Sequence, residues 1–245
     1  SRMAPFTDGG RTIEPTNWSN TFISYYPYGG AIALGLDLTL RDRYEGRITL
    51  DDYMRAMWAT HGKPGGQRPG YVDHPYTLQD AERRLAEVTG DPAFAADIFS
   101  RYIQGREVMD YTKLLARAGF LLRRRSPGHA WMGDLRLENR GAVVLRDTPA
   151  ATSPAYLAGL DRGDEIRSLD GTRVSSDEDV AAAMRRHKPG DTIAVEIVDR
   201  TTKPRTVRVT LQEDPALELL TLEQAGRAPT QSQTAFRASW LGPRR

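Results

Sequence analysis

The hydrophobic and polar positions along the chain change their period once, near residue 120. Before that point, apolar residues recur every three or four positions, as on one face of an α-helix. After it, apolar and polar residues alternate in short runs, as on the two faces of a β-strand. The pattern therefore predicts a helical module over residues 20–119, followed by a smaller module of strands and short helices.

The first predicted helix, from Tyr28 to Arg43, is apolar on nearly every side. Helices of that kind are buried, so we expect the N-terminal end of this helix, its entrance, to lie where the hydrophobic core borders a cavity. The entrance is rich in tyrosine and glycine, at Tyr25, Tyr26, Tyr28, Gly29 and Gly30. Phenol hydroxyls at such a place are either satisfied structural donors or parts of an active site. The pattern alone leaves both readings open.

Four further helices are predicted between residues 49 and 119 from their caps and apolar stripes. Two begin at threonines with an aspartate three residues on, the spacing of a capping box, and two begin at aspartates. These first residues are Thr49, Thr77, Asp91 and Asp110. We expect the stripe that follows Thr49 to be core. It consists of Leu50, Tyr53, Met54, Met57 and Trp58.

Beyond Phe120, four β-rich runs are interrupted by two short helices. The predicted strands are 141–145, 164–169, 192–198 and 205–211, and the predicted helices are 154–158 and 177–187. A small β-sheet capped by two helices makes a second domain, whose boundary falls near Arg125. After Pro215 a polar tail runs to Arg245, and its Trp240-Leu241 pair indicates that its end docks onto a surface.

Composition limits the classes of function. Lys and Arg number 34 against 32 Asp and Glu, a net charge of +2, which gives no electrostatic reason to expect a nucleic acid partner. The sequence has no cysteine, so it forms no disulfide and has no thiol nucleophile. No apolar stretch reaches the length of a membrane span. No signal peptide opens the chain, and its Met is third, so we expect a piece of a longer protein.

Residues 153–166 read SPAYLAGLDRGDEI, followed by LDG at 169–171 and KPGD at 188–191. This pattern resembles a PDZ domain of the bacterial protease-associated type, over roughly residues 128–214. The glycines support the resemblance, because Gly159 and Gly163 allow sharp turns and Asp170-Gly171 is a hairpin turn.

PDZ domains bind a peptide C-terminus as an added strand beside a helix. The resemblance implies a carboxylate-binding loop and an edge strand, Leu135–Glu138, next to a groove helix at 177–187. The implied peptide-binding residues are Trp131, Met132, Gly133, Asp134, Leu135, Val180 and Met184. Asp134 departs from the family, which has an apolar residue there, and its charge would repel a carboxylate. Docking of an internal peptide or of the chain itself therefore stays open beside C-terminal binding.

Four segments of the helical module carry a second resemblance: ISYYPYGGA at 23–31, LDLTLR at 36–41, LDDYM at 50–54 and Asp110 to Gly119. They resemble the glycyl aminopeptidase family of zinc metallopeptidases, in which a thermolysin-like catalytic domain precedes a PDZ domain. The implied fold class is α+β multidomain. The helical C-terminal part of the peptidase domain takes residues 1–125, the PDZ domain 126–215 and a partly ordered tail 216–245.

Members of that family bind zinc through H-E-x-x-H and a glutamate from the next helix. The four histidines, His61, His74, His129 and His187, do not form this motif. The resemblance implies that the zinc helices lie before Ser1, in a missing N-terminal half of the catalytic domain. We expect no metal site and no catalysis in this chain alone, but a zinc aminopeptidase acting on N-terminal residues such as Gly or Ala in the intact protein. The family favours a bacterial periplasmic location.

The same resemblance gives Tyr26 a role, because it stands three residues before Gly29. A tyrosine at that position donates its hydroxyl to the tetrahedral oxyanion, and Tyr25 is the second choice. The alternative is a buried phenol satisfied by a backbone carbonyl. A rival function of another class is a non-catalytic PDZ adaptor that binds peptide segments while its helical module acts as a scaffold.

Overall fold

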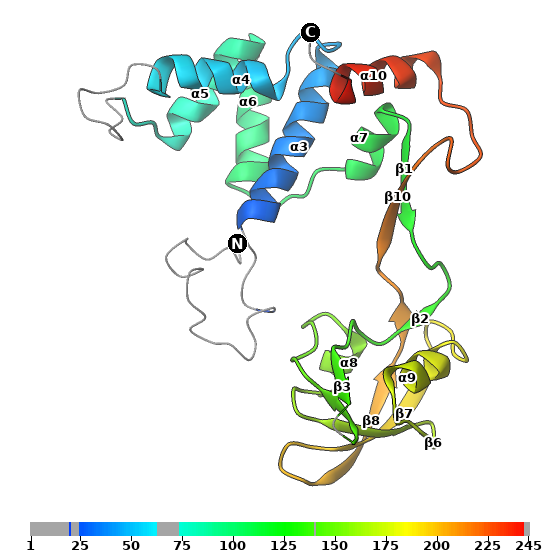
Figure 1. Cartoon of the computed structure of the whole chain (residues 1–245). Helices are drawn as coiled ribbons and strands as arrows, with labels where there is room; N and C mark the ends of the chain where they lie inside the picture. Colours follow the sequence, from blue (N-terminus) through cyan, green and yellow to red (C-terminus); the bar gives the residue numbers. More distant parts are fainter. Residues whose placement is uncertain (1–19, 21–24, 63–73, 140, 243–245) are drawn as a thin grey trace. The chain divides into compact units, whose positions relative to one another are not determined.

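The computed structural model describes residues 20, 25–62, 74–139 and 141–242. The chain divides into two compact units (Figure 1). One unit combines residues 25–123 with residues 219–245, so two separate stretches of the chain build it. The other contains residues 124–218. The fold class is α+β multidomain, since helices dominate the first unit and strands the second.

The first unit is helical, with the labels of Figure 1. Its helical elements are α3 (Tyr25–Arg43), α4 (Leu50–Met57), the π-helical turn η1 (Trp58–Gly62), α5 (Leu78–Thr89), α6 (Pro92–Ile98), the π-helical turn η2 (Phe99–Ile103), α7 (Tyr111–Arg117) and α10 (Gln231–Leu241). Their shared core is mostly aliphatic and aromatic, with Leu40, Leu85 and Ala95 fully buried. All four predicted helix starts are confirmed, because the side chains or capping boxes of Thr49, Thr77, Asp91 and Asp110 cap them.

The expectation that the first helix is wholly buried is wrong for its first half. Helix α3 begins at Tyr25, and its buried residues start only at Gly35. Tyr26 is 69% exposed, and Gly29 and Gly30 are also exposed. Burial begins where α3 meets the segment before α7, since a Cβ on Gly35 would lie 2.1 Å from Met109 Sδ. The apolar pattern indicates which residues tend to avoid water. In the described chain, however, packing partners cover only the second half of α3.

The core stripe predicted after Thr49 is correct for Tyr53 and Met57 and wrong for two other members. Met54 is 55% exposed and Trp58 is 63% exposed. Met54 lies beside the buried stripe on α4, and Trp58 begins the π-helical turn η1, where the helical period changes. The Trp58 ring instead covers Gly62, where a Cβ would lie 2.2 Å from the ring.

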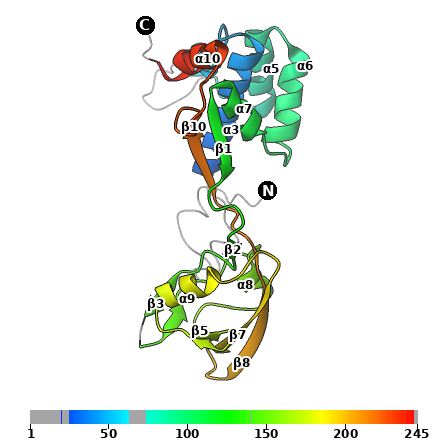
Figure 2. The ribbon, with the colours of Figure 1, turned by 90° about the vertical axis from the view of Figure 1, so that its right-hand side faces the viewer.

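The second unit is built around an antiparallel sheet with strand order β3-β4-β5-β7-β8. The strands are β2 (Ala130–Trp131), β3 (Leu137–Asn139), β4 (Val143–Leu145), β5 (Glu165–Leu169), β6 (Thr172–Arg173), β7 (Thr192–Val198), β8 (Pro204–Thr210) and β9 (Gln212–Glu213). Two helices accompany them, α8 (Pro154–Leu157) and α9 (Asp177–Met184). Figures 1 and 2 show α9 lying over the sheet beside β3. The core is made of the inward-facing residues of these strands, with Val143, Ile193 and Val209 fully buried.

All four predicted strands and both predicted helices of this unit are confirmed, with two shifts at the expected groove. The edge strand β3 begins at Leu137 rather than Leu135, because the backbone N–H of Leu135 turns back to donate to the Gly133 carbonyl at 2.9 Å. Helix α9 ends at Met184 rather than His187. A turn held by the Lys188 N–H bond to the Asp191 carboxylate, 2.8 Å, follows it.

The end of the chain docks onto the first unit. Strand β10 (Leu217–Thr221) pairs with β1 (Phe120–Arg124), and α10 follows it. The Trp240 ring packs edge-on against Phe120 with centroids 6.1 Å apart, which confirms that Trp240 docks. Leu241 stays 58% exposed.

Candidate functional site

A groove of about 220 Å³ lies between β3 and α9 in the second unit. Most of its lining is apolar, and its residues come from β2, the loop after it, β3 and α9. They are Ala130, Trp131, Met132, Gly133, Leu135, Leu137, Asp177, Val180, Ala181 and Met184. Six of the seven residues expected at a peptide groove are thus brought together, and Asp134 stands beside the groove without lining it.

The edge of β3 is open toward this groove. Strand β3 is the last in the sheet order and pairs only with β4 among the described strands. An unpaired strand edge presents N–H and C=O groups that can pair with another extended chain. At its far end the Asn139 side-chain amide donates to the Ser175 carbonyl at 3.0 Å. This bond ties the end of β3 to the segment just before α9.

The loop at the near end of the groove is held from two sides. Ala155 N–H donates to the Met132 carbonyl at 2.8 Å, which ties the loop to α8. Gly133 has φ of 142°, a value that L side chains rarely adopt, and a Cβ there would lie 3.2 Å from Leu135 and Ser153. Only glycine fits this position without strain. The loop is therefore pre-formed before any ligand arrives.

Two acidic residues lie at or beside the groove, Asp177 in its lining and Asp134 next to it. Asp134 is exposed, and its Oδ1 accepts a hydrogen bond from the Trp131 indole N–H at 2.9 Å. Asp177 is the first residue of α9 and the single charged residue among those that line the groove. Its side chain makes no hydrogen bond or ion pair within the described part of the chain. The neighbouring Asp179 is engaged instead, since Ser175 donates to it from its hydroxyl and its backbone and lowers the pKa of the carboxyl.

Four residues that line the groove were not singled out from the sequence, although the last three lie in the predicted edge strand and groove helix: Ala130, Leu137, Ala181 and Asp177. Helical spacing offered a signal for two of them, because Asp177, Ala181 and Met184 are separated by four and three positions and share one face of α9. For Leu137 the signal was the alternation of apolar and polar positions around Arg136. Ala130, which is followed by apolar Trp131 and Met132, had no such signal.

The tyrosine entrance of α3 forms a separate cluster in the first unit. The rings of Tyr25 and Tyr26 are 4.4 Å apart, and their hydrogen bond is the main cause that raises the pKa of Tyr25 to about 12. On the same helix, the Ala31 carbonyl accepts a hydrogen bond from the Tyr111 hydroxyl at 2.8 Å, so Tyr111 is a phenol satisfied by a backbone carbonyl. Burial raises the pKa of Tyr111. Because Tyr26 is 69% exposed, the reading of Tyr26 as a buried structural phenol does not hold for the described chain.

The described residues offer neither a metal site nor a membrane-spanning helix. They contain no group of three or more His, Cys, Asp or Glu that could hold a metal ion, so they do not fit a zinc site. His61 contacts the His74 carbonyl, with Nδ1 and O 2.9 Å apart, and His187 lies between Asp170 and Asp191. No helix among them is both long and apolar enough to cross a bilayer.

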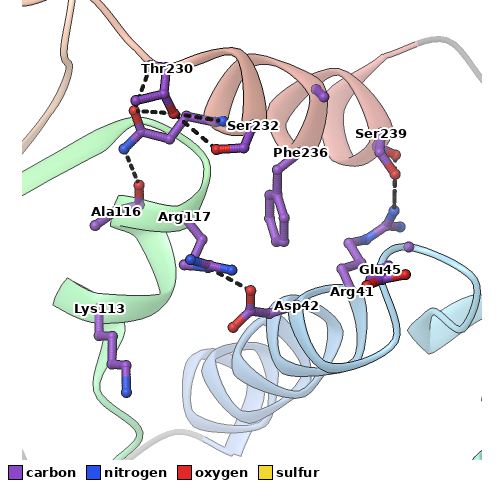
Figure 3. Close-up of a pocket in the computed structure, with 13 residues that line it drawn as sticks. Arg41, Asp42, Glu45, Lys113, Ala116, Arg117, Thr230, Ser232, Phe236 and Ser239 are labelled. Carbon is purple, nitrogen blue, oxygen red and sulfur yellow. Dashed lines mark hydrogen bonds and ion pairs between the residues drawn. The ribbon is translucent and has the colours of Figure 1, made fainter.

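A second hollow, of about 730 Å³, lies among α3, α7 and α10 (Figure 3). Phe236 points into it from α10. Two of its arginines are engaged within the protein: Arg117 bonds to Asp42 at 2.5 Å, and Arg41 bonds to the Ser239 carbonyl at 2.9 Å. Since both guanidinium groups already have partners in the protein, they are less available to a ligand in this hollow.

Residues 132–211 match the PDZ domain family model, which confirms the predicted PDZ domain. No curated protein matches the chain. Among solved structures, an aminopeptidase N family protein from Idiomarina loihiensis matches 90% of this chain with a TM-score of 0.67 and 21% identity. This chain spans 37% of the length of that protein. The two share a fold.

Two proteases match over a shorter range. An HtrA-type protease solved with a decapeptide, AlgW, is 18% identical over 36% of this chain and 30% of its own, with a TM-score of 0.33. A serine endoprotease from Yersinia pestis is 22% identical over 36% of this chain and 30% of its own, with a TM-score of 0.32.

Proposed function

We propose that the groove between β3 and α9 binds an extended peptide segment as an additional strand of the sheet. The observation that carries this proposal is the open edge of β3 beside an apolar hollow, within residues that match a PDZ domain. Backbone hydrogen bonds to the strand edge supply affinity, and the hollow accepts alternate side chains of the added strand.

The groove accepts an internal segment more readily than a free C-terminus. A carboxylate held at the loop would need free backbone N–H groups, but that of Leu135 already donates to Gly133. The Asp134 carboxylate beside the loop also repels a second carboxylate. The partner is therefore an extended stretch of a protein or peptide.

The experiment is a binding titration of the whole chain with fluorescein-labelled decapeptides of alternating apolar and polar residues, measured by anisotropy. The variant Ala181→Trp fills the hollow from an exposed position, so it should weaken binding at least tenfold. The control Glu178→Trp places the same bulk on the same helix outside the groove and should bind as the wild type does. Equal binding by all three proteins would remove the groove as the site.

We also propose that the chain is the helical end and PDZ domain of a zinc-dependent aminopeptidase that removes N-terminal residues such as Gly or Ala. Its support is the shared fold with an aminopeptidase N family protein over 90% of the chain. The residues described here do not form a zinc site, so in this proposal zinc is held by residues outside this sequence. Tyr26, exposed at the start of α3, is the proposed oxyanion donor, with Tyr25 beside it.

A non-catalytic adaptor is the rival to this second proposal. The coding sequence of the full-length protein separates the two, since the peptidase requires H-E-x-x-H and a further glutamate. Metal analysis and an aminoacyl-anilide assay on the full-length protein give the biochemical test. One bound zinc with release of anilide supports the peptidase, and neither zinc nor activity supports the adaptor.

A further inference from the structure

We infer that Asn20 is a positioning residue for the peptide groove: its side-chain amide holds the loop at residues 149–153, and that loop supports the groove loop at residues 131–135. The inference rests on the proposed peptide binding in the groove. Asn20 groups with the second unit, but it lies outside residues 132–211, which match the PDZ domain. The groove is therefore supported by a residue that the domain itself does not contain.

The contact consists of two hydrogen bonds to one short segment. The Asn20 amide nitrogen donates to the Pro149 carbonyl at 2.9 Å. Its amide oxygen accepts from the Ala151 backbone N–H at 2.7 Å. A carbonyl and the N–H two residues later are also the groups to which a residue of a parallel neighbouring strand bonds. The side-chain amide therefore takes the place of a peptide unit and satisfies both groups at once.

Few side chains can make this pair of bonds. Asn and Gln carry a donor and an acceptor on one planar amide, whereas a carboxylate only accepts and a hydroxyl presents a single oxygen. Pro149 is buried and Ala151 is partly buried. Without Asn20, their carbonyl and N–H would lose a partner where water has limited access, which destabilises this conformation of the loop.

The 149–153 loop leads directly to the groove loop. The Ala150 carbonyl accepts from the backbone N–H and the hydroxyl of Ser153, at 2.8 and 2.7 Å. Ser153 is fully buried and caps α8, and its side chain lies 3.2 Å from the position of a Cβ on Gly133. The Ala155 N–H of α8 then donates to the Met132 carbonyl at 2.8 Å. Gly133 and Met132 line the groove, so the Asn20 contact reaches it through two bonded steps.

Loss of the Asn20 bonds should therefore loosen the groove loop more than the sheet. The core of the second unit is built from other residues, mostly of the strands. A groove loop that is no longer held populates other conformations, and a ligand binds more weakly when its binding form is only partly populated. The expected result is weaker peptide binding by a unit whose sheet stays folded.

The first measurement is amide hydrogen exchange of the whole chain without peptide. Asn20→Ala should speed exchange of the Ala151 N–H and, through the loop, of the Ala155 N–H by about threefold to tenfold. The amides of β7 should keep their wild-type protection. Thr152→Ala is the matched control, because Thr152 is exposed in the same loop and its hydroxyl makes no hydrogen bond with the described residues. It should exchange as the wild type does.

The second measurement is the affinity of the groove. The whole chain is titrated with amidated, fluorescein-labelled decapeptides of alternating apolar and polar residues, and binding is followed by anisotropy. Asn20→Ala should bind about threefold to tenfold more weakly than the wild type. Thr152→Ala should bind as the wild type does.

Asn20→Asp adds a readout that a loss of packing would not change. At pH 7 its carboxylate places a second acceptor against the Pro149 carbonyl, so binding should be weakened. A protonated carboxyl has a donor and an acceptor, as the amide has. Its affinity relative to the wild type at the same pH should therefore recover below about pH 4. Asn20→Ala has no group to protonate at this position and should keep a constant ratio.

The outcomes separate this inference from the function on which it rests. Faster exchange of Ala151 and Ala155 together with weaker binding in Asn20→Ala supports it, and wild-type exchange of both amides overturns it. Faster exchange with unchanged affinity removes Asn20 from the groove and leaves peptide binding standing. An Asn20→Asp ratio that does not recover in acid contradicts the two-bond geometry. Failure of every peptide to bind the wild type counts against the proposed peptide binding itself, and the exchange rates still decide whether Asn20 holds the loop.

Discussion

Gly133 combines an unusual backbone angle with close neighbours, and its replacement tests whether the loop is pre-formed. Gly133→Ala should cost about 1–3 kcal/mol in the free energy of unfolding, because its φ of 142° suits glycine and an added Cβ meets Ser153 and Leu135 at 3.2 Å. Urea unfolding measures this loss. Gly141→Ala is the control, since Gly141 has φ of 83° but no atom within 4 Å of an added Cβ. An equal loss in both variants would show that the contacts to Ser153 and Leu135 contribute nothing.

Substitutions of Tyr26 and Tyr111 distinguish a phenol that acts in catalysis from one that stabilises the fold. In the full-length protein, Tyr26→Phe should lower kcat about 10²–10³-fold and change KM little, as expected for a donor used only in the transition state. Tyr111→Phe should lose about 1 kcal/mol of stability, because its hydroxyl donates to Ala31, and keep kcat. Rates on an aminoacyl-anilide and thermal unfolding measure both. An unchanged kcat in Tyr26→Phe would remove Tyr26 from the mechanism.

At the scale of elements, the cap of α5 links stability to pH. Hydrogen bonds from the Thr77 backbone and hydroxyl are the main causes that lower the pKa of Asp80 to about 2. A carboxyl whose pKa is lower in the folded state stabilises the protein above its unfolded pKa of about 3.9. That stabilisation is lost as the pH falls toward 2.

Asp80→Asn should therefore lower the urea midpoint of the helical unit at pH 7 and have a smaller effect at pH 3. The capping box also keeps Asp80 close to Arg83. Glu82→Gln removes a carboxylate from the same helix outside its capping box, so it controls for the loss of charge. A midpoint difference that stays constant from pH 7 to pH 3 would contradict the linkage.

Arg237 is one of the residues that hold helix α10 to its unit. Its guanidinium bonds to the Ala118 carbonyl at 2.9 Å, pairs with Glu223 at 3.1 Å and lies 5.2 Å from the centre of the Phe120 ring. Arg237→Ala should cost about 1–3 kcal/mol of stability, since the Ala118 carbonyl, Glu223 and the Phe120 ring each lose their contact with the guanidinium. Arg227→Ala, at an exposed position, should cost less than 0.5 kcal/mol. Hydrogen exchange of α10 amides would show whether the helix is released.

For the whole molecule, the division of the chain has a practical consequence. Residues 124–218 have their own core and form one continuous stretch, so they should fold alone with one cooperative transition. The helical unit uses residues on both sides of that stretch, so a chain ending at residue 218 should lose stability there. Circular dichroism melts of both truncated proteins check this, and a stable helical unit without residues 219–245 would contradict it.

The whole chain can also be tested for how it binds a peptide, through an internal segment or through a free C-terminus. The whole chain should bind a decapeptide amide at least as tightly as the same decapeptide with a free carboxylate, because Asp134 repels a carboxylate at the loop. Anisotropy titrations of the pair measure the ratio. Tenfold tighter binding of the free acid would establish capture of C-termini instead.

Much of the fold follows from short stretches of sequence. The change of period near residue 120, the caps at Thr77 and Asp91, and the turn at Asp170-Gly171 predict elements that the structure contains. These features depend on residues within about four positions of one another, so local energetics set them. The PDZ domain was recognisable for the same reason, since its spaced glycines and strands are local patterns.

The features that only the tertiary structure determines depend on contacts between segments that are far apart in the chain. The half exposure of α3, the outward position of Trp58 and the docking of α10 depend on which distant segments cover them. The groove likewise needs β3 and α9, about 40 residues apart, before Asp177 can line it. Local periodicity tells which residues avoid water, and packing alone tells which partner covers them.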